Sequence, residues 1–331
     1  MLFVTDTCNL ACGHCFAWRD LNRGEDLTLD ELAALADDLG PLDNLNLAGG
    51  EPFLRPDLPA VVDLFVDRCG VRSVYCPTSG WFTDRTVAAV RAALSRPGLD
   101  RFVVELSFDG LPATHDALRG RSGAFARALA TYDALAALQY EHPRLHVHAI
   151  ATASNQNIDE IQELADHLLI RCPSIEHLNL PLLRGTPKDP SLRPPDPSAH
   201  RRVWEHVQRT WGPRERGRFG GAVGPILQWT RERTVRAQAQ IAPCAAGNLI
   251  AVVRANGDVA LCEERPPVGN LRTEPFPAIW ASAAATAQRA DVRAAGCWCT
   301  NETFLWPSAT FHPPTALRAA VAERSHLRGR R

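Results

Sequence analysis

Two patterns of apolar residues alternate along the first half of the chain. Short runs rich in Val, Ile, Leu and Phe are typical of buried strands, and longer stretches with an apolar residue every three or four positions are typical of helices. The short runs predict strands at 1–7, 45–47, 73–78, 102–108, 145–152 and 175–180. The longer stretches predict helices near 29–39, 58–68, after 83, at 122–138 and near 158–168. Six such units in a row predict an α/β fold built on a parallel sheet.

Two of the predicted helices begin with capping signals. Thr28 is followed three residues later by Glu31, and Asn157 by Glu160, so we expect both pairs to cap helix starts. The alternation of strands and helices leaves the shape of the sheet open, because it suits an open doubly wound sheet and a barrel equally.

The segment 182–197 contains five prolines and marks the end of this alternating region. Helical patterns near 200–210 and 227–239 follow it, before a small cysteine-bearing region. We therefore expect four parts. They are a strand–helix domain at 1–198, bridging helices at 199–240, a small domain at 241–312, and a C-terminal helix with a basic tail at 313–331.

Composition narrows the class of protein. The 331 residues carry a formal net charge of -1, whereas a nucleic-acid-binding surface would be basic. No apolar run is long enough to cross a bilayer, and the first residues read as a strand rather than a signal peptide. We expect a cytoplasmic protein with neither nucleic-acid nor membrane partners. Ten cysteines in such a chain point to metal or redox chemistry rather than to disulfides.

Three cysteines, Cys8, Cys12 and Cys15, directly follow the first predicted strand. A cube of four irons takes four ligands, so three thiolates leave one iron free to bind another molecule. A zinc knuckle is an alternative, but His14 lies inside the loop, where four ligands do not close a tetrahedron comfortably. A ferredoxin would have two-residue gaps and a following Cys-Pro.

Other polar segments follow the second and fourth predicted strands. They are the run Gly49, Gly50, Glu51 and Pro52, and the set Ser107, Asp109 and Arg119. Ligands bind at the carboxyl ends of parallel strands, where these segments are expected to meet. The glycines let the backbone approach a ligand closely, and the arginine fork suits a carboxylate. Each segment also has a structural interpretation, as a tight turn or a solvated surface charge.

The cysteine spacing followed by Gly-Gly-Glu-Pro resembles the radical S-adenosylmethionine (SAM) superfamily. The resemblance implies a partial (β/α)6 barrel related to the TIM barrel. It implies that Cys8, Cys12 and Cys15 hold a 4Fe-4S cluster whose fourth iron is chelated by SAM. In this family the run at 49–52 hydrogen-bonds the SAM amino group.

The segment from Ser107 to Arg119 resembles a run that is common in superfamily members with auxiliary clusters. The resemblance implies that Ser107 and Arg119, which keep the family's twelve-residue separation, contact SAM. Asp109 belongs to the same run, and its role as a cofactor contact stands beside its interpretation as part of a turn. Asn155 or Asn157 could reach the ribose, although Asn157 suits a helix cap better.

A second cysteine group lies in the C-terminal third of the chain. Asn256-Gly257 predicts a hairpin turn between apolar runs at 249–253 and 259–261, which brings Cys244 and Cys262 near each other. With the segments Gly269-Asn270-Leu271 and Ile279-Trp280, this region resembles the SPASM and twitch auxiliary-cluster domains.

The resemblance implies a second 4Fe-4S cluster on Cys244, Cys262, Cys297 and Cys299, and four suitable cysteines favour the shorter twitch form with one cluster. Cys297 and Cys299 are separated by one residue rather than the usual two, and Thr303 stands where relatives often place another cysteine, so the fourth ligand stays open. A closed zinc site is the structural alternative.

Several candidate residues remain outside these motifs. Cys69 and Cys172 lie at predicted helix ends and are expected to be buried, whereas Cys76 could face the pocket. His146 and His148 alternate on one face of the fifth strand. They either point into the barrel and touch substrate or form hydrogen bonds within the sheet, and no third residue supports a metal site.

The resemblance implies an enzyme that reductively cleaves SAM to a 5'-deoxyadenosyl radical and abstracts hydrogen from a substrate. An external donor such as flavodoxin or ferredoxin would supply the electron. An oxidative or bond-forming modification of a peptide by a maturase is the first expectation. A sugar or aminocyclitol dehydrogenase or epimerase is the alternative. A non-catalytic iron-sulfur electron carrier is the alternative of another class. The chain begins at the first predicted strand, so we expect no fused leader-peptide-binding domain, which weighs against the peptide.

Overall fold

The computed structural model describes residues 1–215 and 219–328. Six parallel strands form the main sheet, in the order β6-β5-β4-β3-β2-β1. Their bounds are β1 Leu2–Thr5, β2 Asn44–Gly49, β3 Ser73–Thr78, β4 Arg101–Ser107, β5 Leu145–Ile150 and β6 Ile175–Asn179. The strand order follows the chain without reversal, whereas a doubly wound sheet reverses at a switch point. The structure therefore confirms the partial-barrel expectation.

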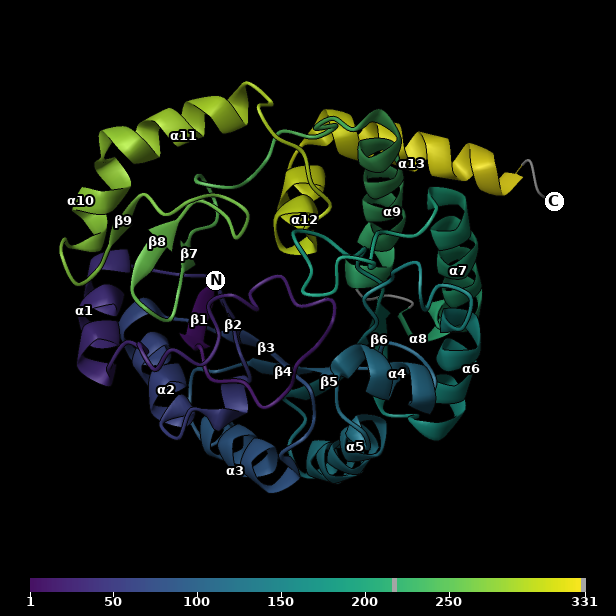
Figure 1. Cartoon of the computed structure of the whole chain (residues 1–331), viewed down its shortest axis with the longest axis horizontal. Helices are drawn as coiled ribbons and strands as arrows, with labels where there is room; N and C mark the ends of the chain where they lie inside the picture. The colour runs from purple at the N-terminus through teal and green to yellow at the C-terminus, as the bar shows by residue number, and fades with distance from the viewer. Residues whose placement is uncertain (216–218, 329–331) are drawn as a thin grey trace.

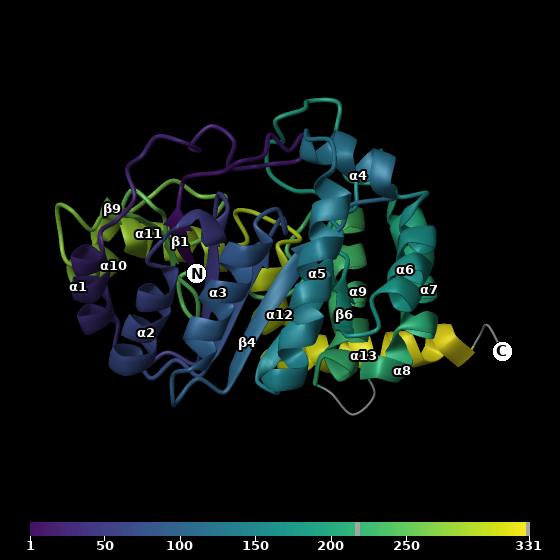
Figure 2. The same ribbon diagram turned by 90° about the horizontal axis from the view of Figure 1, so that it is seen from below.

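Helices cover the outside of this curved sheet, as Figure 1 and Figure 2 show. They are α1 Leu29–Leu39, α2 Leu58–Cys69, α3 Thr83–Leu94, α5 Ala124–Glu141 and α6 Ile161–Arg171. The main hydrophobic core lies between these helices and the sheet, and alternate strand residues such as Phe102, Val104 and Leu106 point into it. The strand residues between them face the inside of the barrel.

Local signals account for several boundaries. Thr28 and Glu31 form the predicted capping box of α1. The predicted cap at Asn157 is wrong: α6 begins at Ile161, and Asn157 Nδ2 donates instead to the carbonyl oxygens of Asp109, at 2.7 Å, and Thr152, at 2.9 Å. A short helix that the apolar pattern did not predict, α4 Pro112–Arg119, follows β4. It places Arg119 over the mouth of the barrel.

The predicted hairpin is present and joins the main sheet. Strands β7 Val252–Val253, β8 Asp258–Ala260 and β9 Gly269–Asn270 pair antiparallel. Val253 on β7 also pairs with Leu2 on β1 in parallel, which makes one nine-stranded sheet. A small second core around Phe3, Val252 and Phe304 seals this junction. The auxiliary region is therefore continuous with the barrel.

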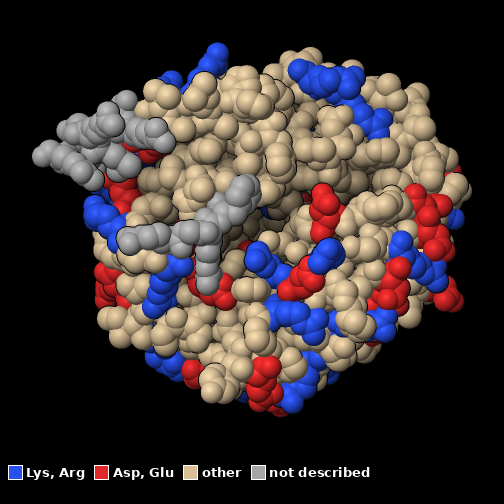
Figure 3. All heavy atoms as spheres, turned by 180° about the vertical axis from the view of Figure 1, so that it is seen from behind, with Lys and Arg blue, Asp and Glu red and all other residues tan. Residues whose placement is uncertain are grey.

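The remaining helices lie in two groups, one beside the hairpin and the other on the side of the barrel near β6 (Figure 1). They are α7 Pro197–Thr210, α8 Gly212–Glu215, α9 Phe219–Ala237, α10 Phe276–Ala281, α11 Ala283–Arg293, α12 Glu302–Thr310 and α13 Pro313–Arg328. Of the basic tail expected at the end of the chain, 329–331 lie outside the described residues. In the described part of the chain, no helix is long and apolar enough to cross a membrane. On the face seen from behind, basic and acidic side chains are interspersed (Figure 3).

Candidate active site

The loop after β1 brings three thiols together at the mouth of the barrel. Cys8, Cys12 and Cys15 are each partly exposed, and a turn joins the Cys15 N–H to the Cys12 carbonyl at 3.2 Å. Burial is the main cause that raises the pKa of Cys15 to about 11, and the neighbouring thiolates of Cys12 and Cys8 act in the same direction. This mutual repulsion means that the thiols lie within reach of one another's charge. A cationic metal centre would relieve that repulsion.

The backbone of the Gly-Gly-Glu-Pro run lies against the strand that leads to the thiols. Gly50 N–H donates to the Thr5 carbonyl and Glu51 N–H to the Thr7 carbonyl, both at 2.8 Å. A Cβ at Gly49 would lie 2.3 Å from the Thr5 oxygen, and one at Gly50 would lie 2.2 Å from the Thr7 oxygen. Such contacts are far closer than van der Waals distances allow. The glycines therefore permit close contact between this run and β1, in addition to any approach to a ligand.

The Glu51 side chain is turned toward β3. Its carboxylate accepts from Thr78 Oγ1 at 2.8 Å, from Ser79 N–H at 2.8 Å and from Ser79 Oγ at 2.7 Å. Burial raises its pKa, although these hydrogen bonds act in the opposite direction. Pro52 is buried at the start of the short 3-10 helix Pro52–Leu54. Glu51 thus ties the ends of β2 and β3 together and fixes the backbone of the run.

Asp109 and Arg119 form a buried ion pair beside the thiols. Arg119 Nη2 lies 2.6 Å from Asp109 Oδ2, and Nη1 lies 3.9 Å from Cys12 Sγ. Burial opposes ionisation of Asp109, yet Arg119 and the nearby histidines hold its pKa below the usual value. Ser107 is buried at the carboxyl end of β4, on the side of the strand that faces the barrel interior. The structure therefore brings Ser107, Asp109 and Arg119 to the cysteine loop.

Further residues orient Asp109, and the sequence patterns did not assign them this role. Asp109 N–H donates to His115 Nδ1 at 3.0 Å, and Asp109 Oδ1 accepts from Thr152 N–H at 2.9 Å. His14 Nε2 lies 3.7 Å from Asp109 Oδ2. Asn157 also binds the Asp109 carbonyl. The His-Asp dipeptide at 115–116 was a sequence signal for His115. The contact of Asn157 with Asp109 joins distant segments of the chain, so no local pattern could indicate it.

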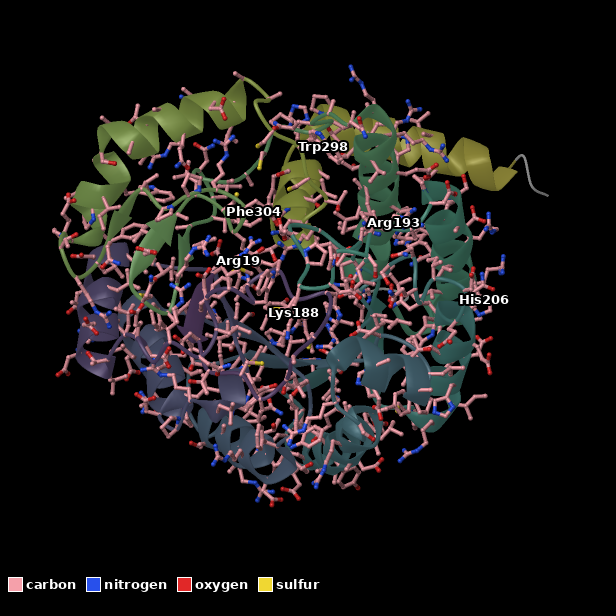
Figure 4. All side chains as sticks on the ribbon, viewed as in Figure 1. Arg19, Lys188, Arg193, His206, Trp298 and Phe304 are labelled. Atoms are coloured by element: carbon pink, nitrogen blue, oxygen red, sulfur yellow. The ribbon has the colours of Figure 1, made fainter. Side chains whose placement is uncertain are left out.

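The four C-terminal cysteines also lie together. Burial is the main cause that raises the pKa of Cys262 and of Cys299 to about 11, and neighbouring thiolates of the same group act in the same direction. Burial also raises the pKa of Cys244, and the charges of Cys262 and Cys297 act in the same direction. A small, largely apolar cavity lies against Cys244, Cys297 and Cys299, and Trp298 and Phe304 line its wall (Figure 4). The sequence grouping of four thiols is thus reproduced in space.

Two family models match the chain. A model of the radical SAM superfamily matches residues 2–168, and a model of the SPASM iron-sulfur cluster-binding domain matches residues 244–301. The chain belongs to the radical SAM superfamily. It is therefore an enzyme that uses a 4Fe-4S cluster and SAM, and its SPASM domain implies auxiliary iron-sulfur chemistry. This membership rules out the alternative of a non-catalytic electron carrier.

Relatives within this superfamily differ in how much of their length is matched. Fe-coproporphyrin III synthase of Methanosarcina barkeri (strain Fusaro / DSM 804) is 37% identical over 38% of this chain and 31% of its own length. AdoMet-dependent heme synthase of the same strain is 29% identical over 85% of this chain and 81% of its own length. Mycofactocin maturase MftC of Mycobacterium ulcerans (strain Agy99) is 28% identical over 88% of this chain and 77% of its own length.

Solved radical SAM structures share the fold. Streptococcus suis SuiB bound to S-adenosylmethionine superposes with a TM-score of 0.63 at 17% identity, over 87% of this chain and 66% of SuiB. The anSMEcpe structure with bound AdoMet and Kp18Cys peptide gives a TM-score of 0.63 at 14% identity, over 87% of this chain and 81% of anSMEcpe. At these identities the likeness concerns the fold alone.

The residues at the radical SAM site fit a cluster and SAM. Three thiols converge, and buried polar groups beside them lack hydrogen-bond partners among the described residues: both polar atoms of the Asn9 side chain and the Nε of Arg119. Buried polar groups usually have partners, so such groups suit a site that binds a polar ligand. Within 1–215 and 219–328, no three His, Cys, Asp or Glu side chains converge in the way that a single metal ion requires.

One arginine connects the two cysteine groups. Arg184, in the segment after β6, lies 2.7 Å from Glu263 Oε2 and 2.9 Å from Glu264 Oε1, directly after Cys262. Its guanidinium lies 4.4 Å from the ring centroid of Phe16, which directly follows Cys15. Arg184 therefore spans the contact between the two parts of the enzyme.

The other cysteines are structural. Cys69 ends α2 and Cys172 follows α6, and both are buried as expected. Cys76 is fully buried in the main core, on the helix-facing side of β3, so the expectation that it could face the pocket is wrong. A hydrogen-donor role for Cys76 in an epimerisation loses its structural basis.

Proposed function

We propose that Cys8, Cys12 and Cys15 hold the SAM-binding 4Fe-4S cluster. The observation that carries this proposal is the convergence of the three thiols with Arg119, whose Nη1 lies 3.9 Å from Cys12 Sγ. When bound, the reduced cluster and SAM supply a 5'-deoxyadenosyl radical that abstracts hydrogen from a substrate carbon. The chain's own groups bind and orient the reactants and exclude water.

Each of the expected SAM contacts has a role that its position supports. The backbone at 49–52, fixed by Glu51, would bind the SAM amino group, and Ser107 would line the pocket at the end of β4. Asp109 holds the Arg119 guanidinium in place, and the unpartnered Nε of Arg119 remains to donate to the SAM carboxylate.

The second site would hold one auxiliary 4Fe-4S cluster on Cys244, Cys262, Cys297 and Cys299. The mutual charge effects among these thiols and the apolar cavity beside them support this assignment. A second redox centre suits a net oxidation or bond formation rather than a simple hydrogen return. An electron donor such as flavodoxin or ferredoxin would serve the first cluster. We keep the four-part division at 1–198, 199–240, 241–312 and 313–331 as part of this proposal.

A peptide is the proposed substrate, modified oxidatively by a maturase reaction. Mycofactocin maturase MftC, which matches most of this chain, supports a maturase reaction. Three cationic side chains at the mouth of the barrel, Arg19, Lys188 and Arg193, are exposed, and no ion pair to an acidic side chain is found for them among the described residues (Figure 4). They would attract carboxylates of a peptide.

A second candidate is a reaction in heme synthesis. AdoMet-dependent heme synthase matches 85% of this chain, and the same cationic side chains would suit the carboxylates of a porphyrin. The sugar or aminocyclitol alternative is tested by adding such compounds to the same assay.

The test is anaerobic reconstitution followed by reaction. Iron and sulfide are counted, and the protein is incubated with dithionite and SAM, with and without peptide or iron-porphyrin candidates. We expect about eight irons per chain and release of 5'-deoxyadenosine, and about four irons and no release from Cys12→Ser. Wild-type protein that holds both clusters yet releases no 5'-deoxyadenosine would contradict the proposal. The substrate whose mass changes in step with release decides between the two candidates.

A further inference from the structure

A row of polar side chains crosses the inside of the barrel below the proposed SAM site. Glu105 on β4 pairs in register with His148 on β5, which pairs with His177 on β6. Glu105 and Ser107 lie on the same side of β4, because they are two residues apart. At about 3.3 Å per residue, Glu105 lies roughly 7 Å below Ser107 along the strand. The row is therefore one layer deeper than the residues expected to contact SAM.

Two of the acidic groups around this row already have imidazole partners. His146 Nδ1 lies 2.9 Å and 3.0 Å from the two carboxylate oxygens of Glu176. His177 Nδ1 lies 2.5 Å from Oε1 of the buried Glu215. These contacts confirm that His146 belongs to a hydrogen-bonded group, and they account for the negative charge of Glu176 and Glu215.

Glu105 differs from these two carboxylates. Among the residues that the structure describes, no side chain or backbone group donates a hydrogen bond to its carboxylate. Burial raises the pKa of Glu105. Burial also lowers the pKa of His148 to about 3, so that ring is neutral and offers no positive charge. The half-buried Glu105 carboxylate thus has two imidazoles beside it but accepts no hydrogen bond from the described residues. Buried polar groups usually have partners, so this site lacks a donor that a ligand could supply.

The available acceptors match one kind of ligand group. His177 uses Nδ1–H toward Glu215, so its Nε2 is an acceptor in the neutral ring. Neutral His148 also offers one acceptor nitrogen, and its ring centroid lies 5.5 Å from that of His177. With the Glu105 carboxylate these make three acceptors, and an ammonium group has three donors and no acceptor. The described side chains do not converge as a single metal ion would require.

We propose that Glu105, His148 and His177 form a subsite that binds a protonated amine of the substrate. The proposal deepens the proposed function and rests on it, since a substrate over the barrel can reach this layer. Its ammonium group could belong to a lysine side chain of a peptide or to an amino sugar. Glu105 fixes this group by a charge-assisted hydrogen bond, and the carbon to be attacked then lies above it, toward Ser107.

Binding measured without turnover tests the subsite separately from the radical reaction. Reconstituted holoenzyme with SAM and no reductant is titrated with two matched pairs: a capped Gly-Lys-Gly peptide against its norleucine counterpart, and glucosamine against glucose. Charge-assisted hydrogen bonds are worth about 1.5–3 kcal/mol, so we expect the amine member of one pair to bind at least about tenfold more tightly. The pair that shows the preference identifies the source of the amine.

Variants locate the effect. Glu105→Gln should reduce the preference to within about twofold, whereas Glu176→Gln, a control carboxylate in the same interior, should keep it. If Glu105→Gln is not folded by thermal unfolding and SAM binding, Glu105→Asp decides, with an expected preference at least about threefold below wild type. No preference in wild type, or an equal preference in the folded Glu105 variant, overturns the subsite. Release of 5'-deoxyadenosine is measured separately, so failure of the radical function is distinguishable.

Discussion

Replacement of Arg184 by glutamine should loosen the contact between the barrel and the auxiliary region. The substitution removes contacts of 2.7 Å to Glu263 and 2.9 Å to Glu264 and leaves the Glu263 carboxylate buried. Loss of one partner of a buried ion pair costs about 3–5 kcal/mol. Because the Arg184 side chain is 21% exposed, solvent screens the pair and we expect the low end, about 3 kcal/mol. Glu264 is more exposed and adds little.

The assay is anaerobic urea unfolding of reconstituted protein, followed by cluster absorbance and tryptophan fluorescence. A loss of about 3 kcal/mol changes the unfolding equilibrium by roughly 100-fold, so the midpoint should fall clearly. We expect the auxiliary cluster to be released at a lower urea concentration than the first cluster. Arg184→Lys keeps the charge but not the planar fork and should lie between wild type and Arg184→Gln.

Arg171 provides the matched control. It also makes two contacts, both to the carboxylate of Asp133, but both of these side chains are exposed, at 41% and 53%. Exposed ion pairs are worth about 0–1 kcal/mol, so Arg171→Gln should unfold nearly as wild type does. If Arg184→Gln and Arg171→Gln unfold alike, the argument that Arg184 joins the two parts of the enzyme is refuted.

Three further predictions concern the two cysteine sites. Glu51→Gln replaces a carboxylate that accepts several hydrogen bonds with an amide that also donates. Thermal unfolding should therefore occur at a lower temperature, and SAM should bind more weakly in equilibrium dialysis. An unchanged unfolding temperature and SAM affinity would mean that Glu51 does not fix the backbone at 49–52. Cys297→Ser and Cys299→Ser should each reduce the iron count from about eight to about four per chain, and a full count would remove that residue from the ligand set. Asp109→Asn frees Arg119 from its ion pair and should weaken SAM binding by at least about tenfold, as measured by calorimetry; retained affinity would show that Arg119 is held by other groups.

Local patterns in the sequence predicted most of the fold. The strands and the Thr28 capping box depend on residues close together in the chain, and the structure confirms them. The cysteine groups were also visible, because their spacing is itself the signal. The thiols of each group do lie together in the structure.

Contacts between distant segments could not be read from the sequence in the same way. Asn157 carries a good capping signal, but its side chain binds the carbonyl of Asp109, in the loop after β4, instead. The row of Glu105, His148 and His177 depends on the register of three strands, which a sequence pattern does not fix. Arg184 reaches Glu263 only after the hairpin has docked.

The pairing of β1 with β7 has a consequence for the order of assembly. Leu2 lies between Leu47 on one side and Val253 on the other, so the strand that carries the cysteine loop gains its second neighbour only after residue 253 has left the ribosome. Until then β1 exposes an unpaired edge next to three free thiols. During synthesis the cysteine loop would therefore be attached to a strand that is paired on one side only. Maturation factors that insert the cluster at Cys8, Cys12 and Cys15 should act on the polypeptide after β7 has paired with β1.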